Sequence, residues 1–150
     1  MKNVKVISVV LMLVLITEIA YVVINVDQLN IITFLLFVIL VPSMLYSASI
    51  AGFLSDINIP SNRIRMFSYG GFAAMFSVVI YLILYGMNES IENIIENSVA
   101  LDQGVSNVSI SAIEHSTGIS SYITIFLMVL IFIIIFSLWL NMLLNKMRER

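Results

Sequence analysis

Glu18 is the side chain in this sequence best suited to chemistry, because it is an acid set inside a long apolar run. It lies four residues from the middle of that run, about 6 Å at a helical rise of 1.5 Å per residue. A charge near the centre of a membrane helix costs roughly 2.5 to 3.5 kcal/mol, and no Lys or Arg stands at this depth. We therefore expect Glu18 to be mostly neutral and to donate a hydrogen bond.

Polar groups on three apolar runs lie at the depth of Glu18 or outward of it. Pro42 lacks a backbone N–H, which leaves the carbonyl of Val38 without its usual helical partner, and a protonated Glu18 would satisfy that carbonyl. Tyr81 stands at the same level of the third run. The positions predict an intramembrane polar seam, open toward the outside, that comprises Glu18, Tyr21, Asn25, Val38, Pro42, Tyr81 and Tyr85.

Two hypotheses explain such a seam. In the first, Glu18 changes protonation and carries a proton or an ion. In the second, hydrogen bonds of commonly about 0.6 kcal/mol each fix the register of the helices. We favour the second, because the inner halves of the first and fourth runs offer almost no polar side chains to continue a path. The variant Glu18→Gln separates the two, since lost ion flux with retained assembly supports transport and unchanged behaviour supports the structural role.

Other chemistry has little support in the sequence. His115 is the single histidine and the chain has no cysteine, which argues against multi-histidine or thiolate metal sites and against paired haem ligands. Glycine-rich phosphate loops and nucleophile motifs are also absent. We expect no catalytic residue, no metal, no cofactor and no nucleic-acid partner.

The elements that position these residues are four apolar runs of about 4–24, 31–54, 66–87 and 119–144. Each is about long enough to cross a hydrocarbon core of about 30 Å as a helix. The hydrophobic fraction of 61% is far above that of a soluble domain, in which about half of the residues are apolar. The expected fold is an all-α integral membrane protein, a four-transmembrane-helix bundle in which residues 1–150 form a single membrane domain.

Positive charge is confined to one side of these runs. The cations precede the first run, separate the second from the third, or follow the fourth, whereas the other connections carry acids alone. Because short loops rich in Lys and Arg stay in the cytoplasm, we expect a multi-pass protein of the cell membrane with cytoplasmic N- and C-termini and an extracytoplasmic loop 88–118. The cations are Lys2, Lys5, Arg63, Arg65, Lys146, Arg148 and Arg150.

Small residues at intervals of four mark where helices can approach closely in lipid. One stripe lies in the second run and another in the third, both toward the cytoplasmic side. We therefore predict that the second and third spans pack tightly there, with the two stripes facing each other. A second interpretation is that small residues are simply common in membrane helices. The stripes are Ser43, Ser47 and Ala51 in the second run and Gly70 and Ala74 in the third.

The loop 88–118 begins with an amphipathic pattern. Apolar residues fall on one helical face and acids on the other, which predicts an amphipathic helix of about three to four turns. An acidic face is unsuited to anionic lipid, so we expect the apolar face to pack on the rim of the bundle or to dock on a partner subunit. The docking residues are Ile91, Ile94, Ile95 and Val99, and the candidate glycosylation acceptors are Asn88 and Asn107.

These features predict a non-catalytic integral membrane subunit that scaffolds or completes a larger membrane protein complex. The fourth run and the loop helix are the expected contact surfaces, and the expected partners are the lipid bilayer and other membrane subunits. A homo-oligomer is compatible with the sequence. The alternative is a small oligomeric ion channel or proton-coupled transporter that uses Glu18, and a third hypothesis is a bilayer-acting protein of the immunity or holin type.

Overall fold

The computed structural model of this chain describes residues 2–55, 61–86, 94, 98 and 119–148. The regular secondary structure of these residues is entirely helical, as the sequence predicts. In chain order the helices are α1 (Lys2–Ile24), the short 3-10 helix η1 (Val26–Gln28), α2 (Ile31–Phe34), the π-helical segment η2 (Leu35–Leu40), α3 (Val41–Ser55), α4 (Asn62–Gly86) and α7 (Ile119–Arg148).

Four helical stretches are long and apolar enough to cross a membrane, which confirms the four expected runs. These stretches are Val4–Ile24, Ile31–Ser55, Asn62–Gly86 and Ser120–Lys146. The third begins four residues before the apolar run because Ser61 caps it: the Ser61 hydroxyl accepts from the N–H of Arg63 at 3.2 Å, and its carbonyl accepts from the N–H of Arg65 at 3.1 Å. Capping, rather than hydropathy, sets this helix end.

The second span is continuous but widens into a π-helix just before its proline. The N–H of Val41 bonds to the carbonyl of Leu36, five residues back, where an α-helix would reach back four. Pro42 follows at once and cannot donate a hydrogen bond of its own. The wider turn thus accommodates the proline without ending the helix, and Val38, inside it, is only 3% exposed.

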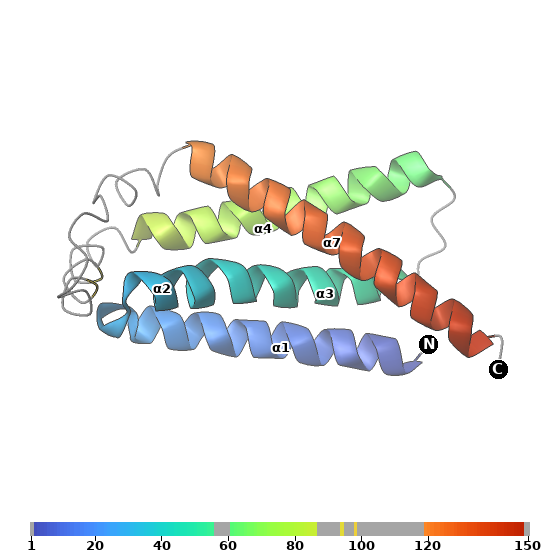
Figure 1. Cartoon of the computed structure of the whole chain (residues 1–150), viewed down its shortest axis with the longest axis horizontal. Helices are drawn as coiled ribbons and strands as arrows, with labels where there is room; N and C mark the ends of the chain where they lie inside the picture. Colours follow the sequence, from blue (N-terminus) through green and yellow to red (C-terminus); the bar gives the residue numbers. More distant parts are fainter. Residues whose placement is uncertain (1, 56–60, 87–93, 95–97, 99–118, 149–150) are drawn as a thin grey trace.

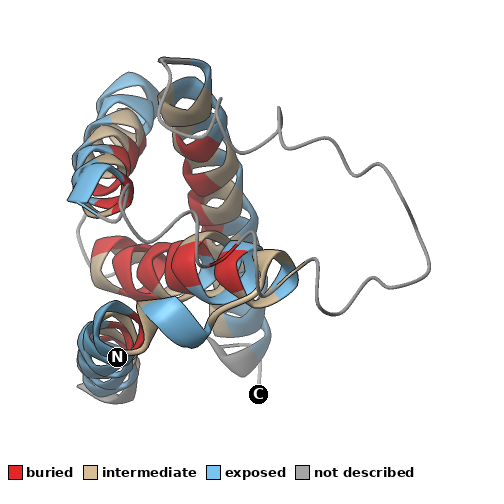
Figure 2. Ribbon diagram, turned by 90° about the vertical axis from the view of Figure 1, so that its left-hand side faces the viewer, coloured by how far each residue is buried: buried red, intermediate tan, exposed pale blue. Residues whose placement is uncertain are grey.

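The helices run alternately up and down, with α3 at the centre (Figure 1). α3 packs mainly against α1 and α7, and α7 crosses obliquely to pack on α4 as well. Figure 2 shows buried residues on the inward sides of the helices, whereas the helix at the N-terminus is mostly exposed. We name the end at which α1 and α4 begin and α7 finishes the termini end, and the end that carries η1 the hairpin end (Figure 1).

α3 has a small-residue face toward each of its two main neighbours. Toward α1, the Ser49 hydroxyl donates to the Ser8 carbonyl at 2.8 Å, and a Cβ built on Gly52 would lie 2.0 Å from the Ser8 Oγ. Toward α7, the Ser47 hydroxyl donates to the Val129 carbonyl at 3.3 Å. Small side chains therefore allow both neighbours to approach the backbone of α3 closely.

The predicted pairing of the α3 stripe with small residues of α4 is wrong. A Cβ on Gly70 would meet nothing within 4 Å, and Ala74 is only half buried, while Ser43, Ser47 and Ala51 are buried. The reason is steric, since α4 meets α3 through large rings. Tyr46 stacks on Phe76 with ring centroids 4.3 Å apart, and its hydroxyl donates to the carbonyl of Phe72 at 3.0 Å.

Candidate functional site

A pocket of about 520 Å³ lies between α1 and the second span at the hairpin end. Most of the residues that line it are polar, and its size falls in the range of small-molecule sites. Three residues of the predicted seam line it, and they are joined by polar residues of the hairpin. The polar lining consists of Thr17, Glu18, Tyr21, Asn25, Gln28, Asn30 and Thr33.

The hairpin that closes this pocket is fixed by local hydrogen bonds. Asn25 ends α1 by donating from both its backbone N–H and its side-chain Nδ2 to the carbonyl of Tyr21, at 3.1 and 2.8 Å. Asn30 then starts α2 through a reciprocal capping box, in which Thr33 N–H donates to Asn30 Oδ1 and Asn30 N–H donates to Thr33 Oγ1, each at 2.9 Å. Such paired bonds hold the rim of the pocket in one geometry.

Glu18 differs from these capping residues. Its two carboxylate oxygens are shielded from solvent and have no hydrogen-bond partner within the described part of the chain. The predicted bond between Glu18 and the Val38 carbonyl is therefore not formed. Its premise was an α-helical turn before Pro42, and the π-helical turn of η2 changes which backbone groups are left over.

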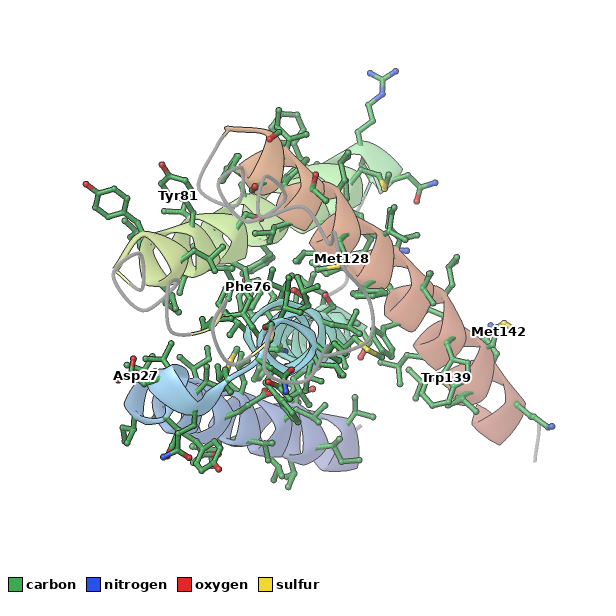
Figure 3. All side chains as sticks on the ribbon, turned by 60° about the vertical axis from the view of Figure 1, so that its left-hand side comes forward. Asp27, Phe76, Tyr81, Met128, Trp139 and Met142 are labelled. Atoms are coloured by element: carbon green, nitrogen blue, oxygen red, sulfur yellow. The ribbon has the colours of Figure 1, made fainter. Side chains whose placement is uncertain are left out.

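The tyrosines expected in the seam stand elsewhere. Tyr81 extends from the side of α4 that faces away from α1 (Figure 3), and Tyr85 is 68% exposed. Between α1, the second span and α4, the packing is apolar and leaves a gap of only about 10 Å³. The residues that line this gap are Ile19, Val22, Val23, Phe37, Val38, Ile80 and Ile83. The structure thus brings Glu18, Tyr21 and Asn25 together and separates them from the tyrosines of α4.

Positive charge lies at the opposite end of the molecule. Among the described residues with placed side chains, Lys5 is near the start of α1, Arg63 and Arg65 are in the first turn of α4, and Lys146 is near the end of α7. Along α1 alone, Glu18 lies thirteen positions after Lys5, which is about 20 Å. The described cations are therefore too far from the Glu18 carboxyl to pair with it.

One residue of the predicted docking helix is described, and it packs inside the protein. Ile94 is 2% exposed and belongs to the core, and the nearby Ser98 hydroxyl accepts from the N–H of Ile31 at 2.8 Å. This position therefore contacts its own bundle instead of offering a docking surface. The other members of that prediction, Ile91, Ile95 and Val99, lie outside the described residues, as do the acceptors Asn88 and Asn107.

Sequence reasoning missed four of the seven polar residues that line the pocket. Asn30 and Thr33 form the spacing of a capping box, which is a signal readable from the sequence. Thr17 stands four residues before Tyr21, so helical spacing was a signal for it as well, whereas the place of Gln28 in the wall depends on how the hairpin folds back. Comparison with protein families, with curated proteins and with solved structures gives no match for this chain.

Proposed function

We propose that this chain is a non-catalytic subunit of the cell membrane that joins a larger membrane protein assembly. Its four apolar helices support insertion in a bilayer, and the charges support an orientation in which the termini end is cytoplasmic. In this orientation the Glu18 pocket opens in the outer half of the membrane. Within the loop 88–118, the described Ile94 is buried in the core of its own bundle.

The observation that carries the proposal is an unpaired acid on the helix that is least covered. In the most apolar window of α1, 17% of the residues are buried inside the protein, against 33% in the windows of the second and third spans. An acid on such a helix is costly in lipid, and the described part of the chain supplies no partner for it. A neighbouring subunit against α1 would remove both costs, because it covers the helix and brings a partner.

α7 has a different exposed face. Ile131, Ile135 and Leu138 are about half exposed, and no ionisable side chain lies near them on the helix. Such a face is already compatible with lipid tails. We therefore propose that the principal contact with a neighbouring subunit is made by α1 and not by the fourth span, which was predicted from the sequence.

The test is the mass of the native particle. Membranes of the natural host are extracted with a mild detergent, and the particle containing the tagged chain is weighed by native mass spectrometry. We expect a mass that includes at least one different protein. A particle whose mass is a whole-number multiple of this chain would overturn the accessory role.

The Glu18 pocket favours one second candidate, a proton-coupled or ion-conducting protein. An acid beside a polar pocket is a reasonable entry site for a proton. Against this, the wall behind the pocket is apolar with a gap of about 10 Å³, which is too small to hold a chain of waters. Purified protein in liposomes with a pH-sensitive dye decides the question: proton flux abolished by Glu18→Gln supports transport, and flux indistinguishable from empty liposomes excludes it.

A further inference from the structure

We infer that the Glu18 pocket receives a basic side chain, Lys or Arg, presented by a membrane helix of a partner protein. The inference rests on the proposed function, because it names the chemical group through which the partner binds α1. Charge complementarity is its first basis. The carboxyl oxygens of Glu18 lack a partner within the described chain, and the described cations stand at the termini end.

Two of the neighbouring polar side chains are already bonded within their own turns. The Thr17 hydroxyl donates to the carbonyl of Val14 at 2.8 Å, and Asn25 Nδ2 donates to the carbonyl of Tyr21. Asn30 Oδ1 and Thr33 Oγ1 each accept from the other residue's backbone N–H. In the described part of the chain, the Glu18 carboxyl is buried without a hydrogen-bond partner, and a long basic side chain brings donors that match it.

The pocket has the shape and lining that a basic side chain requires. Its volume of about 520 Å³ holds a long side chain together with waters. Val14, Val22 and Phe37 provide apolar surface along which the methylene stem of Lys or Arg can lie. Glu18 forms part of the wall and is itself only half buried, and the inference requires its side chain to turn so that the shielded carboxyl oxygens meet the incoming cation.

The surface beside the pocket favours a cation that arrives on a helix. Along α1, Val10, Leu13 and Val14 are 51%, 58% and 46% exposed, so apolar surface continues directly from the pocket toward the termini end. A membrane helix that covers this surface places its own side chains at the level of Glu18. A soluble amine would use the pocket alone and leave this apolar strip uncovered.

The experiment uses the full chain in lipid nanodiscs with designed polyleucine transmembrane peptides as probes. One peptide carries a single Lys at the depth of Glu18, a second carries Leu there, and a third carries the Lys near its opposite end. Fluorescence energy transfer between labelled peptide and protein measures association. We expect the matched Lys peptide to bind about tenfold more tightly than the other two, the factor expected of a hydrogen bond to a charged group.

Two variants of the protein make the result specific. Glu18→Gln, which keeps the size of the side chain, should remove the preference, and Thr17→Val, a neighbouring change in the same wall, should retain it. Circular dichroism establishes that both variants keep their helices. Equal binding of the Lys and Leu peptides to the unaltered protein overturns the inference, and so does a preference that survives in Glu18→Gln.

A further experiment tests whether a small soluble amine, and not a basic side chain on a helix, occupies the pocket. If n-butylammonium binds the nanodisc-embedded protein in a manner that depends on Glu18 while the Lys peptide shows no preference, the pocket takes a small amine and the docking inference fails. These outcomes are independent of the native mass of the particle. A hetero-complex without a Lys preference leaves the accessory function intact and removes only its basic anchor.

Discussion

The contact between α1 and the second span differs at its two ends in whether the buried polar groups have hydrogen-bond partners. Toward the termini end, Ser8, Ser49 and Gly52 bring the helices together, and each buried serine hydroxyl has an acceptor. Toward the hairpin end, the helices leave a pocket, and Glu18 has none within the described residues. The first region is satisfied within one chain, whereas the second is the region at which we propose that a partner binds.

The difference has a simple physical origin. A serine hydroxyl is short enough to bond to a backbone carbonyl one turn back, as Ser8 does to Val4 at 3.0 Å, so it can be buried between helices at little cost. A carboxyl group is larger, and when charged it needs several donors or a cation. In lipid, where water does not supply them, those donors come from the protein or from a partner.

The largest effect is expected from a cross-link between α1 and α3 toward the termini end, which tests whether the helices are in close contact there. The chain has no cysteine, so Ser8→Cys combined with Gly52→Cys introduces a single pair. A Cβ on Gly52 would lie 3.3 Å from the Cβ of Ser8, close to the separation of about 3.8 Å in disulfides. We expect nearly complete cross-linking under mild oxidation, read as a shift on a non-reducing gel.

The control tests the pairing of the second and third spans that was predicted from the sequence and that the structure contradicts. Ser47→Cys combined with Gly70→Cys joins the two small-residue stripes that the sequence suggested would face each other. Because a Cβ on Gly70 meets nothing within 4 Å, this pair should remain reduced. Efficient cross-linking of the control pair, with none between positions 8 and 52, would contradict the packing of α1 against α3.

The next largest effect is expected from a larger side chain at the contact between α1 and α3 toward the termini end. Gly52→Leu drives a side chain into Ser8, and overpacking of this kind typically costs about 1 to 3 kcal/mol of stability. The matched control is Gly71→Leu, since Gly71 is exposed and has nothing within 4 Å of its Cβ position. Reversible unfolding in mixed micelles, followed by circular dichroism, measures both. Equal stability of the two variants would mean that α1 does not approach α3 at Gly52.

Much of the fold could be predicted from the sequence, because hydropathy and charge are properties of single segments. The four spans and the depth of Glu18 follow from counting along apolar runs. Which face of α3 meets which helix does not follow in this way. Small residues line both faces, and the choice depends on rings such as Tyr46 and Phe76, which occupy the α4 side and leave the serines to α1 and α7.

The pocket shows the same limit at a finer scale. Glu18, Tyr21 and Asn25 share a helical face, so their proximity was predictable from spacing. Tyr81 matches Glu18 in depth but not in direction, and depth alone carries no information about rotation around the helix axis. The π-helical turn before Pro42 adds a rotation of its own, which regular α-helical counting cannot anticipate.

The smallest expected changes in the free energy of unfolding come from one substitution at each end. They compare the two ends directly, because the two changes should have opposite signs. Ser49→Ala removes a satisfied interhelical hydrogen bond and should lower the unfolding free energy of the isolated chain by about 0.6 kcal/mol. Glu18→Leu removes a carboxyl without a partner in the described chain, and since such groups cost about 1 kcal/mol or more, it should raise that free energy. Both are measured by unfolding in mixed micelles, with Ser68→Ala, whose hydroxyl bonds only within its own helix, as the control. If Glu18→Leu lowers stability as Ser49→Ala does, the acid is already satisfied within its own chain, and the hairpin end is as complete as the termini end.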